Sequence, residues 1–432
     1  MSSSSSASVT ARATIRQSTG FRLPHVLRVF LAVDLVLLSF AFLCEIVSRF
    51  GLHLGYPYRS PLLSERFPDL VTLRTRFTYL HTLKFFTDTQ QPRCMYPAPV
   101  IAAYSFFYLF KPYDLVAFLL FAILSFSIAA FFFGRALIRR GLATRSTVLL
   151  VSIALLTAYP LWFTCNQANM EICVWVLLSL GVFFFLKGRG YAAGALFGIA
   201  GAMKIFPFVY LGLLLARRQY RQVLFAFVAA AAVTLPALWL AYPHLLESWR
   251  LTNASVAYYR PLIMLHVFPQ TSFDHSLFGL IKICLHPLPP PSVLDPILTA
   301  CLAACALGGL LLYILRIRHL PIINQVLCLC VASILFPPTS FDYTLMQLYA
   351  PWALLAFFAI QPQDDSRSIP GLKAAFICFA ILFVPETEFI IRWHTPYSLG
   401  GQIKALTLIV LFIIGLRYPF DWRESDRQNV VV

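Results

Sequence analysis

The sequence predicts an all-α polytopic membrane protein with about 10 to 12 transmembrane helices. Its composition and its apolar runs both indicate this fold class. Hydrophobic residues make up 59% of the 432 residues and charged residues only 12%, far from the balance of a soluble globular protein. The mean hydropathy is +0.76. The apolar runs recur along the chain and are long enough to cross a bilayer, which takes about 20 residues per helix.

The net charge of +16 sits in short basic clusters between the apolar runs. These clusters contain Arg135, Arg139, Arg140, Arg145, Lys187, Arg189, Arg217, Arg218, Arg221, Arg316 and Arg318. This distribution is the positive-inside signature, and it argues against a nucleic acid partner. We therefore expect these loops and both termini in the cytoplasm. One transmembrane domain, residues 25–417, is expected between a disordered tail, residues 1–24, and a cytoplasmic tail, residues 418–432.

Two long polar loops, residues 51–96 and 243–292, are predicted on the outer face. The first holds only three carboxylates, Glu65, Asp69 and Asp88, among several basic residues. Its stretch 69–79 has helical apolar spacing and no Gly or Pro, so we expect a short helix at the membrane surface. Polar and aromatic residues gather in the outer loops, and we expect the active site there.

An acid among cations and aromatic residues beside a bilayer suggests chemistry on an anionic, lipid-borne substrate. One such reaction, transfer of a sugar from a lipid phosphate to an alcohol, needs a base, cations for the departing phosphate and a polar platform for the sugar. Asp69 is the candidate base because it follows Pro68 at the start of the predicted helix. The alternative is an N-cap with no further role. Arg76 and Lys84, in the same loop, are candidate phosphate ligands.

Lys204 lies inside an apolar stretch, where an ionisable residue is costly and is by default a functional hypothesis. It could bind a lipid phosphate as a point charge, or its side chain could extend to the headgroup layer. Together with Pro207 it interrupts residues 191–216. Two arrangements are compatible with this interruption: two half-helices that meet near Lys204, or one kinked span. A face of small residues earlier in this stretch, including Gly194 and Gly198, predicts tight helix packing.

The polar run that contains Asn166, Gln167 and Asn169 could form hydrogen bonds with a sugar. Alternatively it is a polar turn that caps two helices, with Glu171 as a cap of the second. The cysteines include no CxxC pair and are expected to be core residues. No metal site and no cofactor are expected.

Several stretches, in this order, resemble glycosyltransferase family 87, the polyprenol-phosphate-mannose-dependent mannosyltransferase-like proteins of the GT-C superfamily. The resemblance runs from Asp69 to Pro351. Asp69 is followed by a Tyr-Pro at Tyr96, and NQAN leads into an apolar helix. AAGALFGIAGAMKIFPFVYLGLLLARRQYR is similar to the family's small-residue helix. TSFDHSLFGLIK resembles an outer Asn-Gln-Ser-Leu motif, and FPPTSFDYTLMQLYAP resembles a Ser-Pro-x-Ser-Trp-x-His segment in which Tyr343 stands at the His position.

This resemblance implies a GT-C fold and an inverting transfer of a hexose, often mannose, from a polyprenyl phosphate to a hydroxyl acceptor. The acceptor would be a glycolipid or a cell-envelope glycan, and the site would lie on the outer face of a bacterial cytoplasmic membrane. The resemblance assigns the role of base to Asp69. It also implies that the remaining residues of the site include Lys204, Tyr96, Ser276, Ser340, Asp342 and Tyr343.

Two other functions are compatible with the sequence. A lipid or sugar transporter or flippase would also have polytopic helices, Gly-Pro interruptions and an intramembrane lysine. It should place polar residues near the midplane, reachable from both sides, whereas here they concentrate on one face and no inverted repeat is recognisable. A non-catalytic assembly protein or polymer-ligase partner would tolerate the loss of Asp69.

Overall fold

The protein is described by a computed structural model. It covers residues 23–46, 67–87, 94–258, 260–261, 274–285, 289–360, 371–385 and 399–421. The expected N-terminal tail up to residue 22, most of the C-terminal tail, and parts of both long outer loops lie outside these ranges. The acidic residues Glu65 and Asp88 also lie outside them.

The described residues form helices and no strands, so the all-α prediction is confirmed. The first half of the chain contains α2 (His25–Ile46), α3 (Pro68–Arg76), η3 (Phe77–Tyr79), α4 (Lys84–Thr87), α5 (Ala98–Tyr108), α6 (Asp114–Arg139), α7 (Thr144–Leu156), α8 (Tyr159–Gln167), α9 (Glu171–Leu186), α10 (Gly190–Met203), η4 (Phe206–Tyr210) and α11 (Leu211–Ala216). The second half contains α12 (Tyr220–Ala241), α13 (Leu245–Ala257), α14 (Leu277–Cys284), α15 (Pro291–Leu315), η7 (Ile317–His319), α16 (Ile322–Leu335), η8 (Asp342–Leu348), α17 (Tyr349–Ala359), α18 (Leu372–Phe383) and α19 (Gly400–Arg417).

The protein is a multi-pass membrane protein. Within the described ranges, 5 helices are long and apolar enough to cross a membrane: α2, α6, α12, α15 continued into η7, and α19. The bent pair α7 and α8 raises the number to 6. The sequence-based expectation of about 10 to 12 spans took most apolar runs as crossings. The other apolar helices are only 10–17 residues long, because proline and polar residues divide the runs.

The short helix predicted at residues 69–79 is confirmed as α3 followed by η3. Its apolar side chains Leu70, Leu73 and Phe77 are all buried. The residue that caps the helix is Phe67, with a left-handed backbone (φ 61°), and Asp69 lies in the first turn. Asp69 is therefore not the N-cap, and its carboxylate is available for contacts outside its own helix.

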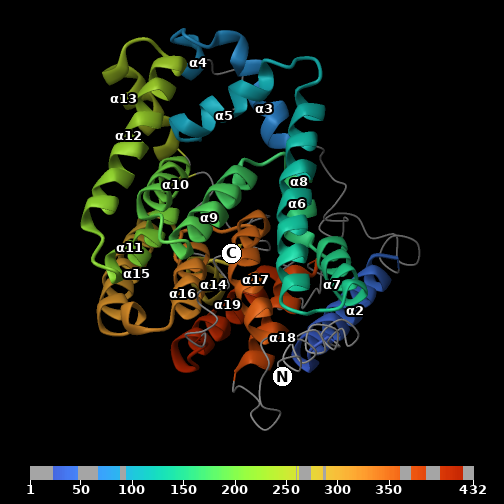
Figure 1. Cartoon of the computed structure of the whole chain (residues 1–432). Helices are drawn as coiled ribbons and strands as arrows, with labels where there is room; N and C mark the ends of the chain where they lie inside the picture. The colour runs from blue at the N-terminus through green and yellow to red at the C-terminus, as the bar shows by residue number, and fades with distance from the viewer. Residues whose placement is uncertain are drawn as a thin grey trace, which may run out of the picture.

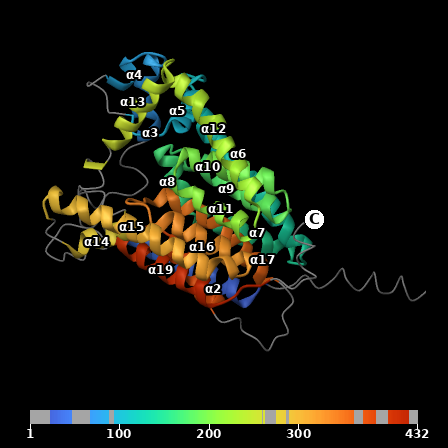
Figure 2. The same ribbon diagram turned by 90° about the vertical axis from the view of Figure 1, so that its left-hand side faces the viewer.

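The helices of the first predicted outer loop and α13 from the second lie at one end of the molecule, whereas α14, also from the second loop, packs on α19 farther down. Figures 1 and 2 show α3, α4, α5 and α13 together at the top. α13 packs on α4, and α3 packs on α5. The His81 amide donates to the Ala241 carbonyl at 3.2 Å, which joins the first loop to the end of α12. An ion pair of 2.5 Å between Arg74 and Asp114 joins α3 to the start of α6.

The opposite end of the molecule is a packed base of helices. α2 packs on α18, and α19 packs on both α16 and α18, in the lower part of Figure 1. The Phe30 ring of α2 lies 5.5 Å from the Trp352 ring and 6.0 Å from the Phe376 ring. This base supports the segments after α16 that reach the candidate site.

The break expected near Lys204 is present. α10 ends at Met203, Lys204 has an extended backbone (φ −142°, ψ 133°), and η4 and α11 follow. Of the two arrangements left open by the sequence, the structure has the two short helices. The small face of α10 packs against α12, as predicted, and a Cβ atom on Gly198 would lie 2.0 Å from the Ala226 carbonyl oxygen.

Replacing Gly198 with alanine is expected to destabilise the protein by about 1–3 kcal/mol, because the atom it strikes belongs to the backbone of α12 and cannot move aside. The matched control is Gly308→Ala on α15, where the added Cβ meets nothing within 4 Å. That change should be neutral or stabilising by up to about 1 kcal/mol. Thermal unfolding in detergent compares the two variants, and equal shifts would contradict the close packing of α10 on α12.

Candidate active site

The carboxylate of Asp69 is held by two neighbouring side chains. The Asn169 Nδ2 atom donates to Asp69 Oδ2 at 2.6 Å, and the Tyr96 hydroxyl also forms a hydrogen bond with this carboxylate. Asp69 is half-buried. The α3 helix is attached to the turn that carries Asn169, because the Phe67 amide donates to the Asn166 carbonyl at 2.7 Å.

Opposing effects set the protonation of Asp69. Burial raises the pKa of its carboxyl above the ordinary value, and this is the largest effect. The hydrogen bonds from Asn169 and Tyr96 and the positive charge of Lys204 act in the other direction. A general base works best when its pKa lies near the working pH, and a raised pKa moves an aspartate in that direction.

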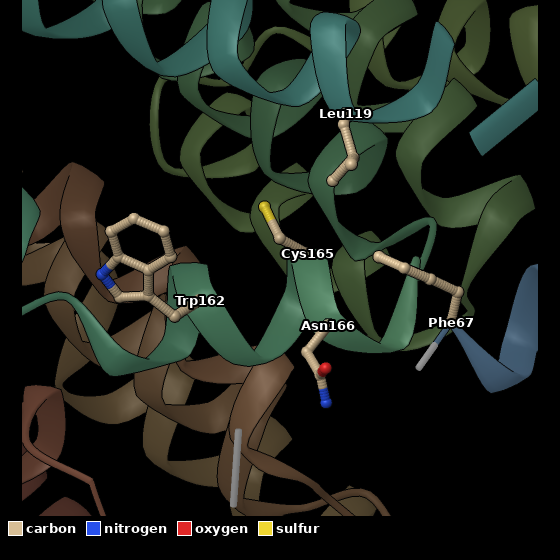
Figure 3. A pocket seen from close by; sticks show the side chains of 5 residues that line it. All are labelled: Phe67, Leu119, Trp162, Cys165 and Asn166. Carbon is tan, nitrogen blue, oxygen red and sulfur yellow. The ribbon is translucent and has the colours of Figure 1, made fainter. Parts of the chain in front are cut away.

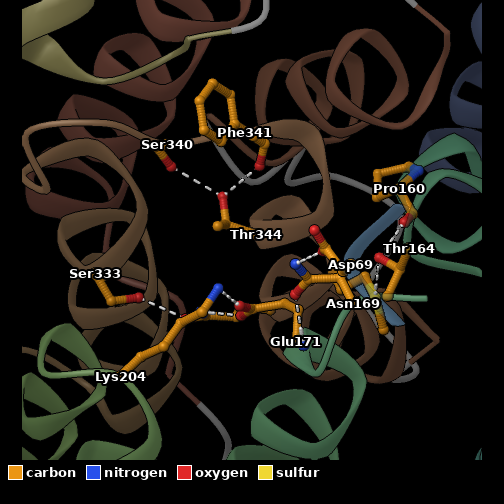
Figure 4. Close-up of polar contacts among 12 residues, drawn as sticks. Asp69, Pro160, Thr164, Asn169, Glu171, Lys204, Ser333, Ser340, Phe341 and Thr344 are labelled. Carbon is orange, nitrogen blue, oxygen red and sulfur yellow. Dashed lines mark hydrogen bonds and ion pairs between the residues drawn. The ribbon is translucent and has the colours of Figure 1, made fainter. Parts of the chain in front are cut away.

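Lys204 forms an ion pair with Glu171 close to Asp69, as Figure 4 shows. Glu171 is fully buried, whereas the Lys204 side chain is 28% exposed. The second oxygen of Glu171 accepts a hydrogen bond from Gln347 Nε2 at 2.7 Å, and the Ser333 hydroxyl donates to Gln347 Oε1 at 2.7 Å. Both oxygens of the Glu171 carboxylate thus have protein partners, and the Lys204 side chain remains partly exposed.

An aromatic ring lies against the Lys204 ammonium. Its Nζ atom lies 4.6 Å from the centre of the Tyr343 ring, a cation–π distance. The Tyr343 ring in turn stacks on Phe163, at 6.1 Å and 14° between planes. Tyr343 also lies close enough to Tyr96 to interact with it electrostatically. Asp69, Tyr96, Asn169, Lys204 and Tyr343 therefore form one cluster, drawn from five separate segments.

Behind Tyr343, Asp342 is part of a second, wholly buried polar set. Asp342 pairs with Lys404 of α19 at 2.7 Å, and the His275 ring lies 3.8 Å from the same carboxylate. Burial, with Lys404 nearby, lowers the pKa of His275 well below its ordinary value, so the imidazole is neutral. The Ser340 hydroxyl contacts His275 Nε2 at 3.1 Å.

The segment before α14 is fixed by the same set. Asp274 pairs with Lys282 at 3.2 Å, and its carboxylate also accepts the Ser276 and Ser340 amides at 3.0 Å. Ser276 is the N-cap of α14 and accepts from the Gly279 amide at 2.9 Å. The side chains of Ser276, Ser340 and Asp342 are thus engaged with protein, and they hold the loop that presents Tyr343.

The remaining predicted site residues, Arg76, Lys84 and Gln167, lie outside the cluster. Arg76 is fully buried two turns beyond Asp69, about 10 Å along the helix, and donates to the Phe85 carbonyl. Lys84 is exposed on α4, with its Nζ atom 4.1 Å from the centre of the Tyr79 ring. Gln167 is the last residue of α8. Of the three cations predicted for the site, Arg76, Lys84 and Lys204, it is Lys204 that lies beside Asp69.

A pocket of about 270 Å³ opens between α6, α8 and the residue that caps α3 (Figure 3). Its wall is mainly apolar and consists of Phe67, Leu119, Trp162, Cys165 and Asn166. Leu119 belongs to α6, one of the membrane-crossing helices, and Trp162 is 48% exposed on α8. Phe67 caps α3, so the pocket lies at the start of the helix that carries Asp69.

The sequence model of glycosyltransferase family 87 matches residues 95–338, which is more than half of the chain. The chain belongs to glycosyltransferase family 87. It is therefore a membrane glycosyltransferase, and the family resemblance found in its sequence is confirmed. Comparisons with curated proteins and with solved structures gave no match. The family 87 match includes Tyr96, Asn169 and Lys204, begins after Asp69 and ends before Tyr343.

The sequence contained a signal for the partner of Lys204. Glu171 is the only acidic residue between Asp114 and Glu247, and a lysine within an apolar stretch needs a counter-charge. The sequence-based interpretation of Glu171 as a simple helix cap overlooked this need for a counter-charge. Lys404 lies in the apolar stretch of α19 and carries the same signal of a missing counter-charge, but its partner Asp342 is far away in sequence and is identified only by tertiary packing. Among the described residues, no group of three or more His, Cys, Asp or Glu side chains could hold a metal ion.

Proposed function

We propose that this family 87 enzyme transfers a hexose, mannose above all, from a polyprenyl phosphate to a hydroxyl group of a glycolipid or cell-envelope glycan. One observation carries the proposal: a half-buried carboxylate, Asp69, lies beside a partly exposed ammonium, Lys204. The first group suits proton removal from an alcohol, and the second suits a departing phosphate.

In the proposed reaction, the acceptor hydroxyl gives its proton to Asp69 while its oxygen bonds to the anomeric carbon. The bond from that carbon to the phosphate oxygen breaks, and the electron pair leaves with the polyprenyl phosphate. Attack and departure occur on opposite faces of the sugar, so the anomeric configuration inverts. Lys204 stabilises the negative charge that grows on the phosphate. The stacked rings of Phe163 and Tyr343 would support the sugar beside the ammonium.

The proposed site faces the extracytoplasmic side of a bacterial cytoplasmic membrane. The basic ends of several helices support this orientation. Arg217, at the end of α11, donates to the Phe185 carbonyl near the end of α9, and α11 also packs on the basic η7. Clustered cations favour the cytoplasm. In this orientation α3, α4 and α13 lie outside.

The apolar pocket at the start of α3 is the proposed binding site for the first isoprenoid units of the donor. Replacing Trp162 with alanine should raise KM for a long-chain donor about tenfold, which corresponds to about 1.4 kcal/mol of lost apolar contact. A donor with a short chain should be affected much less. The control is Trp249→Ala, because Trp249 is similarly exposed (51%) but lies on α13. Equal effects of both substitutions on KM, or no dependence on chain length, would contradict this binding site.

The direct test is incubation of the purified protein with a panel of polyprenyl-phosphate hexoses and candidate hydroxyl acceptors. The readout is loss of sugar from the lipid and its appearance on the acceptor with inverted configuration. Transport of the intact lipid-linked sugar across a vesicle membrane, with the sugar still attached, would instead support the flippase function.

A further inference from the structure

The side chain of Asn169 connects the start of α9 to Asp69. It is only 3% exposed. Its Oδ1 atom accepts a hydrogen bond from the Glu171 amide at 2.9 Å, and its Nδ2 atom donates to Asp69 Oδ2 at 2.6 Å. Figure 4 shows the amide between the aspartate and the first residue of α9.

The orientation of this amide group follows from chemistry. A backbone N–H can only donate, so the side-chain oxygen must face Glu171 and the NH₂ group must face Asp69. The backbone of the turn is fixed as well. The Asn169 amide donates to the Thr164 carbonyl at 3.1 Å. Ala168 has a left-handed backbone (φ 52°), and its carbonyl accepts from the Tyr104 hydroxyl at 3.0 Å.

We propose that Asn169 is a positioning residue that fixes the orientation of Asp69 and presents a donor to its ionised form. This inference rests on the proposed role of Asp69 as base. It differs from the sequence-based prediction, in which Asn169 contacts the sugar. The amide group has a second N–H and a second lone pair, but the side chain is only 3% exposed, which leaves little of it accessible to a sugar.

The titratable and charged groups around Asp69 come from several elements. Tyr96, before α5, contacts the carboxylate, and Tyr104 of α5 interacts with it electrostatically. Lys204, after α10, contributes its positive charge, which is shared with Glu171 of α9. Tyr343 lies beside Lys204. Of the side chains that contact the Asp69 carboxylate, Asn169 is the one whose orientation is also fixed by a backbone amide, which donates to its Oδ1 atom.

Asn169→Asp is the sharpest variant because it preserves the oxygen that accepts from Glu171 and replaces only the donor. A carboxylate in that place removes a hydrogen bond to the ionised base and adds a like charge, so the pair of carboxylates titrates with one strongly raised pKa. A base is active when ionised, and activity falls as the pH drops through its pKa. The acid limb of kcat/KM should therefore move up by about one pH unit or more. Asn169→Ala, which also removes the donor, should move the limb in the same direction.

KM for the donor should stay within about twofold in both variants, because a positioning residue acts through the base. The matched control is Asn324→Asp. Asn324 is also a buried amide, with Nδ2 bonded to two carbonyls and Oδ1 to a backbone amide, but it joins α16 to the end of α19. This control should lose stability without a shift of the acid limb. An unchanged limb in Asn169→Asp, with KM raised about tenfold, would overturn the proposal in favour of a sugar contact.

A second measurement does not depend on turnover. Infrared difference spectra against Asp69→Asn report the protonated carboxyl of Asp69 as a function of pH. Its titration should move to higher pH in Asn169→Ala, which removes the donor and adds no carboxyl of its own. No movement would overturn the role of Asn169 even in inactive variants. If the wild-type enzyme transfers no hexose but the titration still moves, the proposed function fails and the positioning role stands.

Discussion

Asp69→Asn is expected to reduce kcat by about 10²–10⁴-fold, the range that a general base contributes. Asparagine fits the same space but cannot accept the proton of the acceptor. KM for the donor should change little, because Lys204, Tyr96 and Tyr343 remain in place. The measurement is steady-state transfer by the purified variant.

The control for this change is Asp295→Asn. Asp295 lies on α15 and pairs with Arg260 at a site where both side chains are partly exposed. This variant removes one carboxylate and one ion pair without contacting the cluster around Asp69. Its kcat should match that of the wild type. Retained turnover in Asp69→Asn would remove Asp69 from the role of base, whatever the behaviour of the control.

Lys404→Met is expected to lower the free energy of unfolding by about 3–5 kcal/mol, because it leaves the Asp342 carboxylate buried without its cation. The neighbouring imidazole of His275 cannot replace that charge, since burial keeps it neutral. The measurement is thermal or chemical unfolding in detergent. Asp342→Asn combined with Lys404→Met should recover part of the loss, because the stranded charge is gone.

Lys373→Met is the matched control for the Lys404 substitution. Lys373 is an exposed residue of the adjacent helix α18, and its replacement should change stability by less than about 0.5 kcal/mol. If Lys404→Met were as stable as this control, the ion pair with Asp342 would not be what holds the loop carrying Tyr343.

Local patterns were enough to predict part of this structure. The spacing of Leu70, Leu73 and Phe77 predicted the short helix α3, and the structure adds that these side chains are buried. The position of Lys204 in an apolar stretch predicted the break after α10. Both features depend on short-range periodicity or on the cost of charge in an apolar environment, and these can be read from a single sequence.

The number of spans and most of the site contacts depend on tertiary structure. Apolar runs predict helices, but their lengths after proline and polar interruptions decide which ones cross the membrane. The opposite ends of the Asn169 amide face two different elements, α3 and α9, and no spacing rule predicts this. Arg76 was a reasonable phosphate ligand by sequence, yet it lies buried against the Phe85 carbonyl.

The most direct test of Asp69 as base is a single-turnover comparison of wild type and Asp69→Asn, reconstituted in vesicles and loaded with equal amounts of polyprenyl-phosphate sugar. Donor occupancy and transferred sugar are measured in the same samples after acceptor is added. We predict equal occupancy, with inverted product from the wild type and sugar still on the lipid in the variant. Equal transfer by the two proteins at equal occupancy would contradict a role for the Asp69 carboxylate in removing the acceptor proton.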